Sequence, residues 1–176
     1  MYYRRKILLS LIQVFEGELE KIQLQKLLFL YTRSQRQKKT YDFVPYKMGC
    51  FSFQANADLL TLKKYGNVSE SDKSWKKEDD VNYLNELTKE DKKIISDFRI
   101  IYANKTSEDL INLTYKRYPY FAINSIIAQN YLSESEIENL NNYRSFDEEV
   151  VLFTIGYEGI SLESYLNKLI KNNIKV

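Results

Sequence analysis

The sequence predicts a mainly α-helical fold, in which a winged-helix-like helical domain with a small β-hairpin precedes a C-terminal β-α fragment. Three observations support this fold class. Apolar residues recur at helical spacing in the first half, a short hairpin follows the third predicted helix, and a β-branched run interrupts the helical pattern near the C-terminus. The 176 residues, of which 44% are hydrophobic and 28% charged, have the composition of a globular chain.

The first two predicted helices differ in how much of their surface is apolar. The first has one apolar stripe and ends near Gly17; the stripe consists of Leu8, Leu11, Ile12 and Phe15. The second, from about residue 20 to 36, adds Phe29 and Leu30 to a stripe formed by Leu24, Leu27, Leu28 and Tyr31. Because a helix that is apolar on all sides is buried on all sides, we expect it at the centre of the domain.

The next segment predicts the third helix and the hairpin. Residues 41–48 are expected to be extended around Pro45, and Gly49 interrupts them. Ser52 begins a helix that ends before Gly66, with Ala55, Leu59 and Leu62 as its apolar rows. Val68 and Trp75, with polar residues between them, predict a two-stranded hairpin. Three helices followed by a hairpin is the order of a winged-helix domain.

Downstream, three Ser/Thr residues are each followed three positions later by an acid, which is a helix-start signature. The pairs are Thr88 with Asp91, Thr106 with Asp109, and Ser133 with Glu136. The first helix carries Ile94, Phe98, Ile101 and Tyr102. The second carries Leu110 and Leu113 and ends at Pro119. A further helix is predicted from Tyr120 to Tyr131, and the Ser133 helix is polar and exposed.

The pattern changes at the C-terminus. The run from Val150 to Ile155 predicts a buried strand, Ser161 caps a helix, and Ile174 begins a second strand. We therefore predict a domain over residues 1–145 and an incomplete α/β domain over residues 150–176. Since a lone strand leaves its backbone groups unpaired, we expect residues 150–176 either to form a homodimer or to be stabilised against the helical domain.

Two family resemblances follow from these segments. The first covers about residues 3–130 and rests on residues 24–30, residues 45–52 and the helix from Leu59 to Gly66. These resemble the SocA-like antitoxin family, also called Panacea or DUF4065, although Cys50 stands where that family usually has proline. The family is a mainly helical module whose members neutralise toxins, direct partner proteins to proteolysis or are fused to other domains. The resemblance implies protein binding rather than catalysis.

The second resemblance covers residues 151–176. The segment from Phe153 to Leu162, with Ile174 to Val176, is similar to the opening of the DUF488 family. The polar and cysteine motifs typical of that family lie further downstream, so its chemistry does not transfer to these residues. The resemblance implies that the chain is an N-terminal module of a larger DUF488 protein.

Composition excludes most catalytic chemistry. The sequence has no histidine and one cysteine, Cys50, so it contains no Ser-His or Cys-His dyad, no internal disulfide and no multi-cysteine zinc site. Cys50 is expected to be a buried structural thiol. We predict that the protein is not an enzyme, with no catalytic or metal-binding residues and no cofactor.

Charge is unevenly distributed. Residues 1–66 carry 12 Lys and Arg against 5 Asp and Glu, and residues 67–150 carry 11 against 17. The candidate nucleic-acid contacts are Arg33, Arg36, Lys38, Lys39, Lys63 and Lys64. Against DNA binding, the third helix is expected to expose Gln54, Asp58 and Thr61, and an aspartate repels phosphate. A solvated surface is the favoured interpretation of this charge, ahead of a protein contact and then of a nucleic-acid contact.

Aromatic residues gather around Pro119, where Tyr115, Tyr118, Tyr120 and Phe121 form either core or a protein-contact patch, with core favoured. Together these features predict a cytoplasmic, non-enzymatic adaptor or regulatory module that binds a protein partner and no membrane. The resemblance to the Panacea family implies an antitoxin-like or phage-defence setting. The alternatives are a DNA-binding winged-helix regulator and an accessory domain of a larger DUF488 protein.

Overall fold

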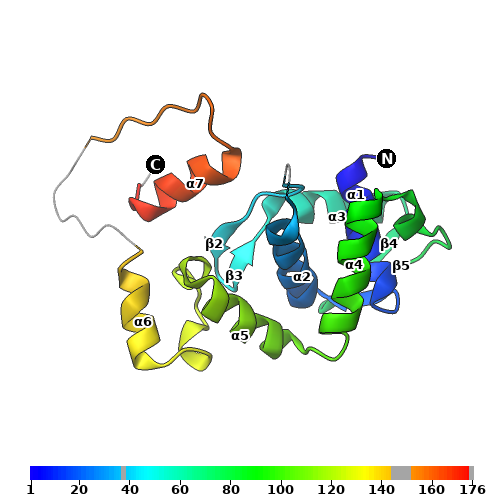
Figure 1. Cartoon of the computed structure of the whole chain (residues 1–176), viewed down its shortest axis with the longest axis horizontal. Coiled ribbons are helices and arrows are strands. Elements are labelled where there is room, and N and C mark those ends of the chain that lie inside the picture. The colour runs from blue at the N-terminus through cyan, green and yellow to red at the C-terminus, as the bar shows by residue number, and fades with distance from the viewer. Residues whose placement is uncertain (37–38, 144–151, 175–176) are drawn as a thin grey trace. The chain divides into compact units, whose positions relative to one another are not determined.

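The computed structural model describes residues 1–36, 39–143 and 152–174 (Figure 1). The chain divides into two compact units, both discontinuous in sequence. Unit 1 consists of Met1–Tyr41 and Ser52–Ile111, and unit 2 of Asp42–Phe51 and Asn112–Val176. The boundary predicted from the sequence lies between residues 145 and 150, and these two units are divided at other positions. Helices dominate the described residues, which confirms the mainly α fold class.

The first half of unit 1 has the element order of a winged-helix domain. Its helices are α1 (Tyr3–Val14), α2 (Lys21–Ser34) and α3 (Phe53–Lys64). The predicted hairpin is formed by β4 (Val68–Glu70) and β5 (Ser74–Lys77). A strand that was not predicted, β1 (Glu18–Glu20), pairs antiparallel with β5, so the sheet has the order β1-β5-β4.

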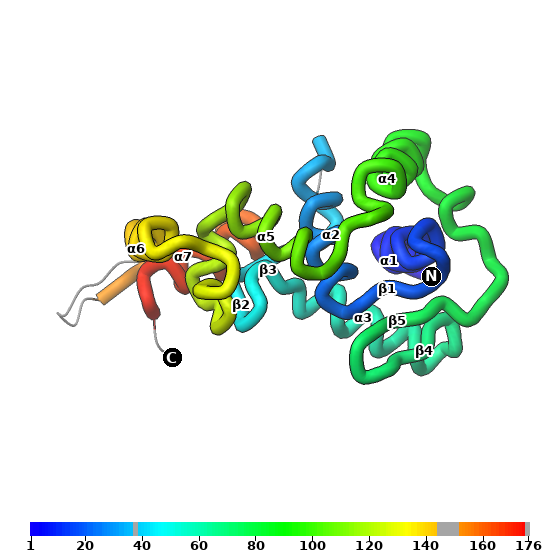
Figure 2. The backbone as a smooth tube through the Cα atoms, turned by 90° about the horizontal axis from the view of Figure 1, so that it is seen from below, coloured from blue at the N-terminus to red at the C-terminus, as the bar shows by residue number. Residues whose placement is uncertain are grey.

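The core of unit 1 forms around α1 and α2. Seen close to the axis of α1, the other elements of the unit surround that helix (Figure 2). Every residue from Leu24 to Thr32 of α2 is buried, as predicted from its all-round apolar sequence. Gly17, with a φ of 82°, ends the α1 segment in the left-handed conformation that glycine adopts without strain.

Residues 83–111 complete unit 1. A 3₁₀ turn, η1 (Tyr83–Glu86), packs on α1 and precedes α4 (Lys89–Tyr102). Thr88 caps α4 as predicted, but the buried face of α4 is formed by Asp91, Ile95 and Phe98, while the predicted core residue Ile101 is 59% exposed. The predicted start of α5 (Ser107–Arg117) is confirmed by reciprocal hydrogen bonds between Thr106 and Asp109.

Unit 2 is built from a hairpin, short turns and two helices. The segment predicted as extended forms β2 (Val44–Tyr46), which pairs antiparallel with β3 (Gly49–Phe51). The end of α5, η2 (Pro119–Ala122), η3 (Ala128–Asn130) and α6 (Glu134–Asn141) follow. Ser133 caps α6 in the predicted capping box, and Ser161 caps α7 (Leu162–Lys171).

Two predictions in unit 2 are wrong. The helix predicted from Tyr120 to Tyr131 is replaced by the turns η2 and η3, and Pro119 begins the first of them. Residues 152–155 form neither strand nor helix, and Leu152 is 90% exposed, because none of the described strands pairs with them. Val150 and Val151 lie outside the described residues, as do the last two residues of the predicted second strand. No helix of the described ranges is both long and apolar enough to cross a membrane.

Candidate functional site

The helix α3 occupies the position of a recognition helix in the order of a winged-helix domain. Ser52 caps it, because the Ser52 hydroxyl accepts a hydrogen bond from the Ala55 N–H at 3.2 Å. Ala55, Leu59 and Leu62 face the core as predicted.

Asp58 also lies on the buried face of α3, which corrects a prediction. Asp58 is 2% exposed rather than outward-facing, and of the predicted outer residues only Gln54 is fully exposed, with Thr61 half-buried. The Nε atoms of Arg4 and Arg5 lie 2.5 Å and 2.7 Å from the Asp58 carboxylate oxygens. The Tyr41 hydroxyl lies 3.1 Å from the same carboxylate. The sequence could not show this pairing, because the arginines lie more than 50 residues before Asp58.

These partners explain the ionisation of Asp58. Burial acts to raise the pKa of Asp58, but hydrogen bonds and attraction from Arg4 and Arg5 outweigh it and hold the pKa below its ordinary value. Burial, together with the nearby carboxylate, raises the pKa of the Tyr41 hydroxyl. Asp58 is therefore a structural anion inside unit 1, so its charge is neutralised and the argument that it repels phosphate no longer holds.

The outer face of α3 is apolar. Phe53 is 56% exposed and Leu60 is 43% exposed, and Ala57 lies between them at helical spacing. Exposed Lys64 ends this stripe, which we call the α3 face and define as Phe53, Ala57, Leu60 and Lys64. The sequence contains a signal for this exposed stripe. Besides the row that packs in the core, α3 carries a second row of apolar residues, which packing of the helix does not require.

The predicted nucleic-acid residues belong to two elements. Around the end of α2, the Arg33 guanidinium lies 4.7 Å from the Phe29 ring centre, and Arg36 and Lys39 line a pocket. At the end of α3, the Lys63 amine lies 2.9 Å from Glu70, which also binds Lys21 on its other oxygen at 2.7 Å. Lys64 is exposed, and Lys38 lies outside the described residues.

Two of the four predicted aromatic contact residues, Tyr115 and Phe121, are core residues of unit 2. Tyr115 is 1% exposed and Phe121 is 9% exposed, so neither offers a contact surface. Tyr118 and Tyr120 are half-buried. Burial raises the pKa of Tyr115 to about 12, and its hydroxyl is hydrogen-bonded to Ser125 at 2.6 Å. The core alternative is therefore correct for Tyr115 and Phe121.

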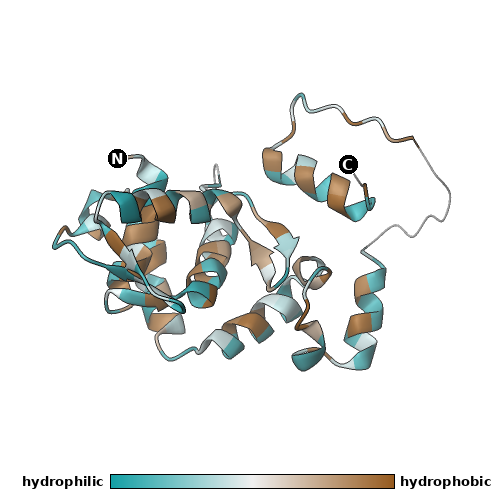
Figure 3. Ribbon diagram, turned by 180° about the vertical axis from the view of Figure 1, so that it is seen from behind, coloured by the Kyte–Doolittle hydropathy of each residue, from teal (hydrophilic) through white to brown (hydrophobic). Residues whose placement is uncertain are grey.

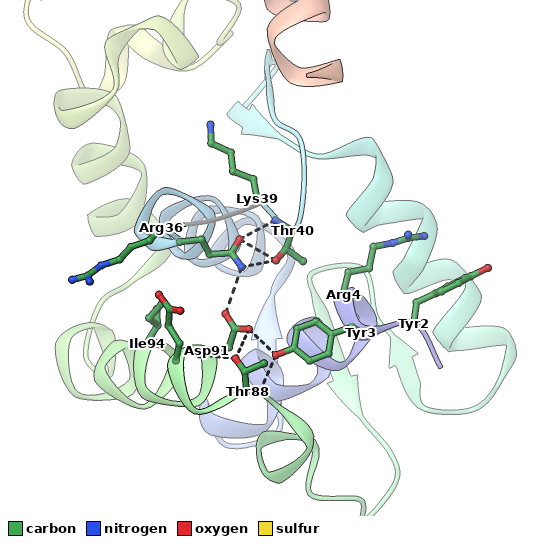
Figure 4. Close-up of a pocket in the computed structure, with 11 residues that line it drawn as sticks. Tyr2, Tyr3, Arg4, Arg36, Lys39, Thr40, Thr88, Asp91 and Ile94 are labelled. Atoms are coloured by element: carbon green, nitrogen blue, oxygen red, sulfur yellow. Dashed lines mark hydrogen bonds between the residues drawn. The ribbon is translucent and has the colours of Figure 1, made fainter. Parts of the chain in front are cut away.

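A pocket of about 600 Å³ in unit 1 contains Asp91 of α4 (Figure 4). Asp91 accepts hydrogen bonds from the hydroxyls of Tyr3 at 2.6 Å, Thr88 at 2.9 Å and Tyr31. The Tyr3 hydroxyl in turn accepts the Thr88 N–H at 2.9 Å. Burial acts to raise the pKa of Asp91, but these hydrogen bonds hold it below its ordinary value.

The polar groups at the floor of this pocket are thus used within the fold. In Figure 4 the side chains of Arg36 and Lys39 extend away from Asp91. The carboxylate joins the start of α4 to α1 and α2, so we interpret the cluster of Tyr3, Tyr31, Thr88 and Asp91 as structural.

Cys50 lies in β3 opposite Pro45 and is 3% exposed, which confirms that the thiol is buried. Among the described residues, no three or more Cys, Asp or Glu side chains are grouped as a metal site.

Comparison with known proteins gave no match, whether with family models, curated proteins or solved structures. The resemblances to the Panacea and DUF488 families therefore stay predictions.

Proposed function

We propose that the chain is a non-enzymatic, protein-binding adaptor or regulatory module that contacts its partner through the α3 face. The observation that carries the proposal is the exposed apolar stripe of Phe53, Ala57 and Leu60 on a helix whose opposite face is already packed in the core. Exposed aromatic and aliphatic residues at helical spacing are typical anchors of protein interfaces.

The composition of the α3 face favours a protein over DNA. A helix that reads the major groove presents Arg, Lys, Asn or Gln to the base edges, whereas the centre of this face is Ala57 and Leu60. The lysine beside it, Lys63, is paired with Glu70, and Asp72 adds a negative charge in the β4–β5 turn. These acids reduce the attraction of this region for phosphate.

The resemblance to Panacea-type modules supports the same function and adds an antitoxin-like or phage-defence setting in the cytoplasm. The absence of histidine supports a non-enzymatic role, because the commonest proton-transfer side chain is missing. An accessory domain of a larger DUF488 protein is compatible with this binding role, since an accessory domain also acts by contact.

The test compares single substitutions on the α3 face with a matched substitution elsewhere in unit 1. Leu60→Glu and Phe53→Glu each place a charge on the face, and Ile100→Glu places the same charge on α4, where Ile100 is 80% exposed. We expect the immobilised wild-type chain to retain a protein partner from a lysate of the cells that produce this chain. Both α3 variants are expected to weaken its Kd by roughly thirty-fold, the effect of about 2 kcal/mol at an interface anchor.

The Ile100→Glu control should bind like wild type, and all three variants should keep the wild-type melting temperature. Mobility shifts with duplex DNA at near-physiological salt should show only non-specific binding, with Kd of about 10⁻⁴–10⁻⁶ M. Sequence-selective DNA binding at nanomolar protein that is weakened by Lys64→Gln would overturn the proposal in favour of a DNA-binding regulator.

A further inference from the structure

The outer edge of the β2–β3 hairpin in unit 2 is closed in an unusual way. The Phe43 N–H, just before β2, donates to Glu163 Oε2 at 3.0 Å. The Phe43 carbonyl accepts from Asn167 Nδ2 at 3.0 Å. Glu163 and Asn167 lie one turn apart on α7. An acid and an amide of a helix therefore satisfy both backbone groups that an adjacent strand would otherwise pair.

Residues next to the hairpin also form hydrogen bonds with α7. Asp42 Oδ1 accepts the Glu163 N–H at 3.2 Å, close to the start of the helix. The Tyr120 hydroxyl lies 3.0 Å from both the carbonyl and the side-chain oxygen of Asn167. Glu163 is only 7% exposed, so its carboxylate is buried in this contact. The surface formed by Asp42, Phe43 and Tyr120, which we call the helix receptor, thus matches a particular pair of side chains.

The rest of this edge is not open to an added strand. Pro45 has no N–H, and its carbonyl accepts from Asn124 Nδ2 at 3.3 Å. The Lys47 carbonyl accepts the Ile126 N–H at 3.0 Å. Only the backbone groups of Phe43 are left for α7, which fits a helix presenting two polar side chains better than an extended peptide.

Polar contacts fix the position of α7, and its apolar side chains are only partly buried. Hydrophobic and hydrophilic residues alternate along the helix (Figure 3). Leu162 is 57% exposed, Leu166 and Leu169 are half-buried, and Glu163 is the buried residue of α7. Residues 152–160, which precede the α7 cap, contain no helix or strand. Burying a carboxylate also costs free energy that its hydrogen bonds must offset. The partial burial of its apolar residues and the cost of the buried carboxylate both limit how tightly α7 is held.

We propose that the helix receptor binds an amphipathic helix that carries a carboxylate and, four residues later, a carboxamide. Within the chain α7 occupies the receptor, and a partner helix with the same pattern replaces it. A tethered helix has an effective concentration in the millimolar range. A partner helix must therefore bind the helix receptor more tightly than α7 does, or bind when the contact between α7 and the receptor has been weakened. This inference is independent of the α3 face.

The exchange rate of the Phe43 amide hydrogen in the full chain tests the proposal, since that N–H is bonded to Glu163. The double variant Glu163→Ala/Asn167→Ala releases α7, and Glu158→Ala, an exposed acid before the helix, is the control. We expect Phe43 exchange at least tenfold faster in the double variant and unchanged in the control.

A synthetic peptide with the sequence of residues 159–173, added at a few hundred micromolar, should restore Phe43 protection in the double variant. The same peptide with both alanine substitutions should not. Tyr120→Phe, which removes one receptor hydroxyl and keeps the ring, should accelerate Phe43 exchange less than the double variant does.

Phe43 protection that persists in the double variant, or that the wild-type peptide fails to restore, would overturn the proposal. If the double variant does not fold, unchanged Phe43 exchange in Tyr120→Phe overturns it instead. Protection that rises with protein concentration in the wild type would show that a second copy supplies the helix and would overturn occupancy by α7 of the same chain.

Discussion

Removing the carboxylate of Asp58 is the sharpest test of how unit 1 is held together. The substitution Asp58→Ala leaves two guanidinium groups without their anion; the side chain of Arg5 is 14% exposed and that of Arg4 is 33% exposed. Removing one partner of a buried ion pair costs about 3–5 kcal/mol. Because Arg4 is partly hydrated and can turn to solvent, we expect a loss near the lower end, about 3 kcal/mol.

The single tryptophan provides a local readout. Trp75 belongs to β5 in unit 1 and is 2% exposed, so its fluorescence reports the unfolding of that unit. With a urea dependence of about 1–3 kcal/mol per molar, a loss of about 3 kcal/mol lowers the midpoint by about 1–3 M.

Two controls separate this buried pair from an ordinary one. Asp97→Ala removes an exposed ion pair with Lys93, 2.6 Å long and one turn apart on α4, and should cost only about 0.3–0.5 kcal/mol. Asp58→Asn keeps the shape and removes the charge, so it should cost nearly as much as Asp58→Ala. A value for Asp58→Ala within about 1 kcal/mol of that for Asp97→Ala would refute the reasoning.

Three further outcomes are expected. Tyr31→Phe removes a buried donor from Asp91 and should lower the free energy of unfolding by about 1–3 kcal/mol in the same urea assay. The pKa values of Asp58 and Asp91 in the folded protein lie below their ordinary values, so ionisation of these carboxyls stabilises the fold. This contribution should be complete above about pH 5 and should decrease as the pH falls below the unfolded pKa of about 3.9. Urea midpoints measured between pH 7 and pH 3 test this, and a midpoint independent of pH would contradict it. Cys50→Ser places a hydroxyl at a buried site and should cost about 1–3 kcal/mol in thermal melts, with partner binding retained.

Features encoded within a few residues were predictable from the sequence. Ser52, Thr88 and Ser133 cap helices because each cap and its N–H partner lie three positions apart. The burial of α2 followed from its apolar composition. By contrast, β1 has one apolar residue, Leu19, and becomes a strand because it pairs with β5, more than 50 residues later.

Long-range pairing also explains the errors at the candidate site. The burial of Asp58 depends on Arg4 and Arg5, and no periodicity within α3 contains that information. In place of the aspartate, the outer face presents Phe53 and Leu60. A polar residue on an apolar helix is expected to face water unless a distant partner neutralises it.

The discontinuity of the two units imposes an order on folding during synthesis. Tyr3 is separated by 88 residues from Asp91, and Phe43 by 120 residues from Glu163. At about 5–20 residues per second, a ribosome needs about 4–18 s to add the first of these spans and about 6–24 s to add the second. The backbone groups of Phe43 therefore stay hydrated or chaperone-bound until α7 has been synthesised, and slow codons between residues 112 and 163 would prolong that exposed interval.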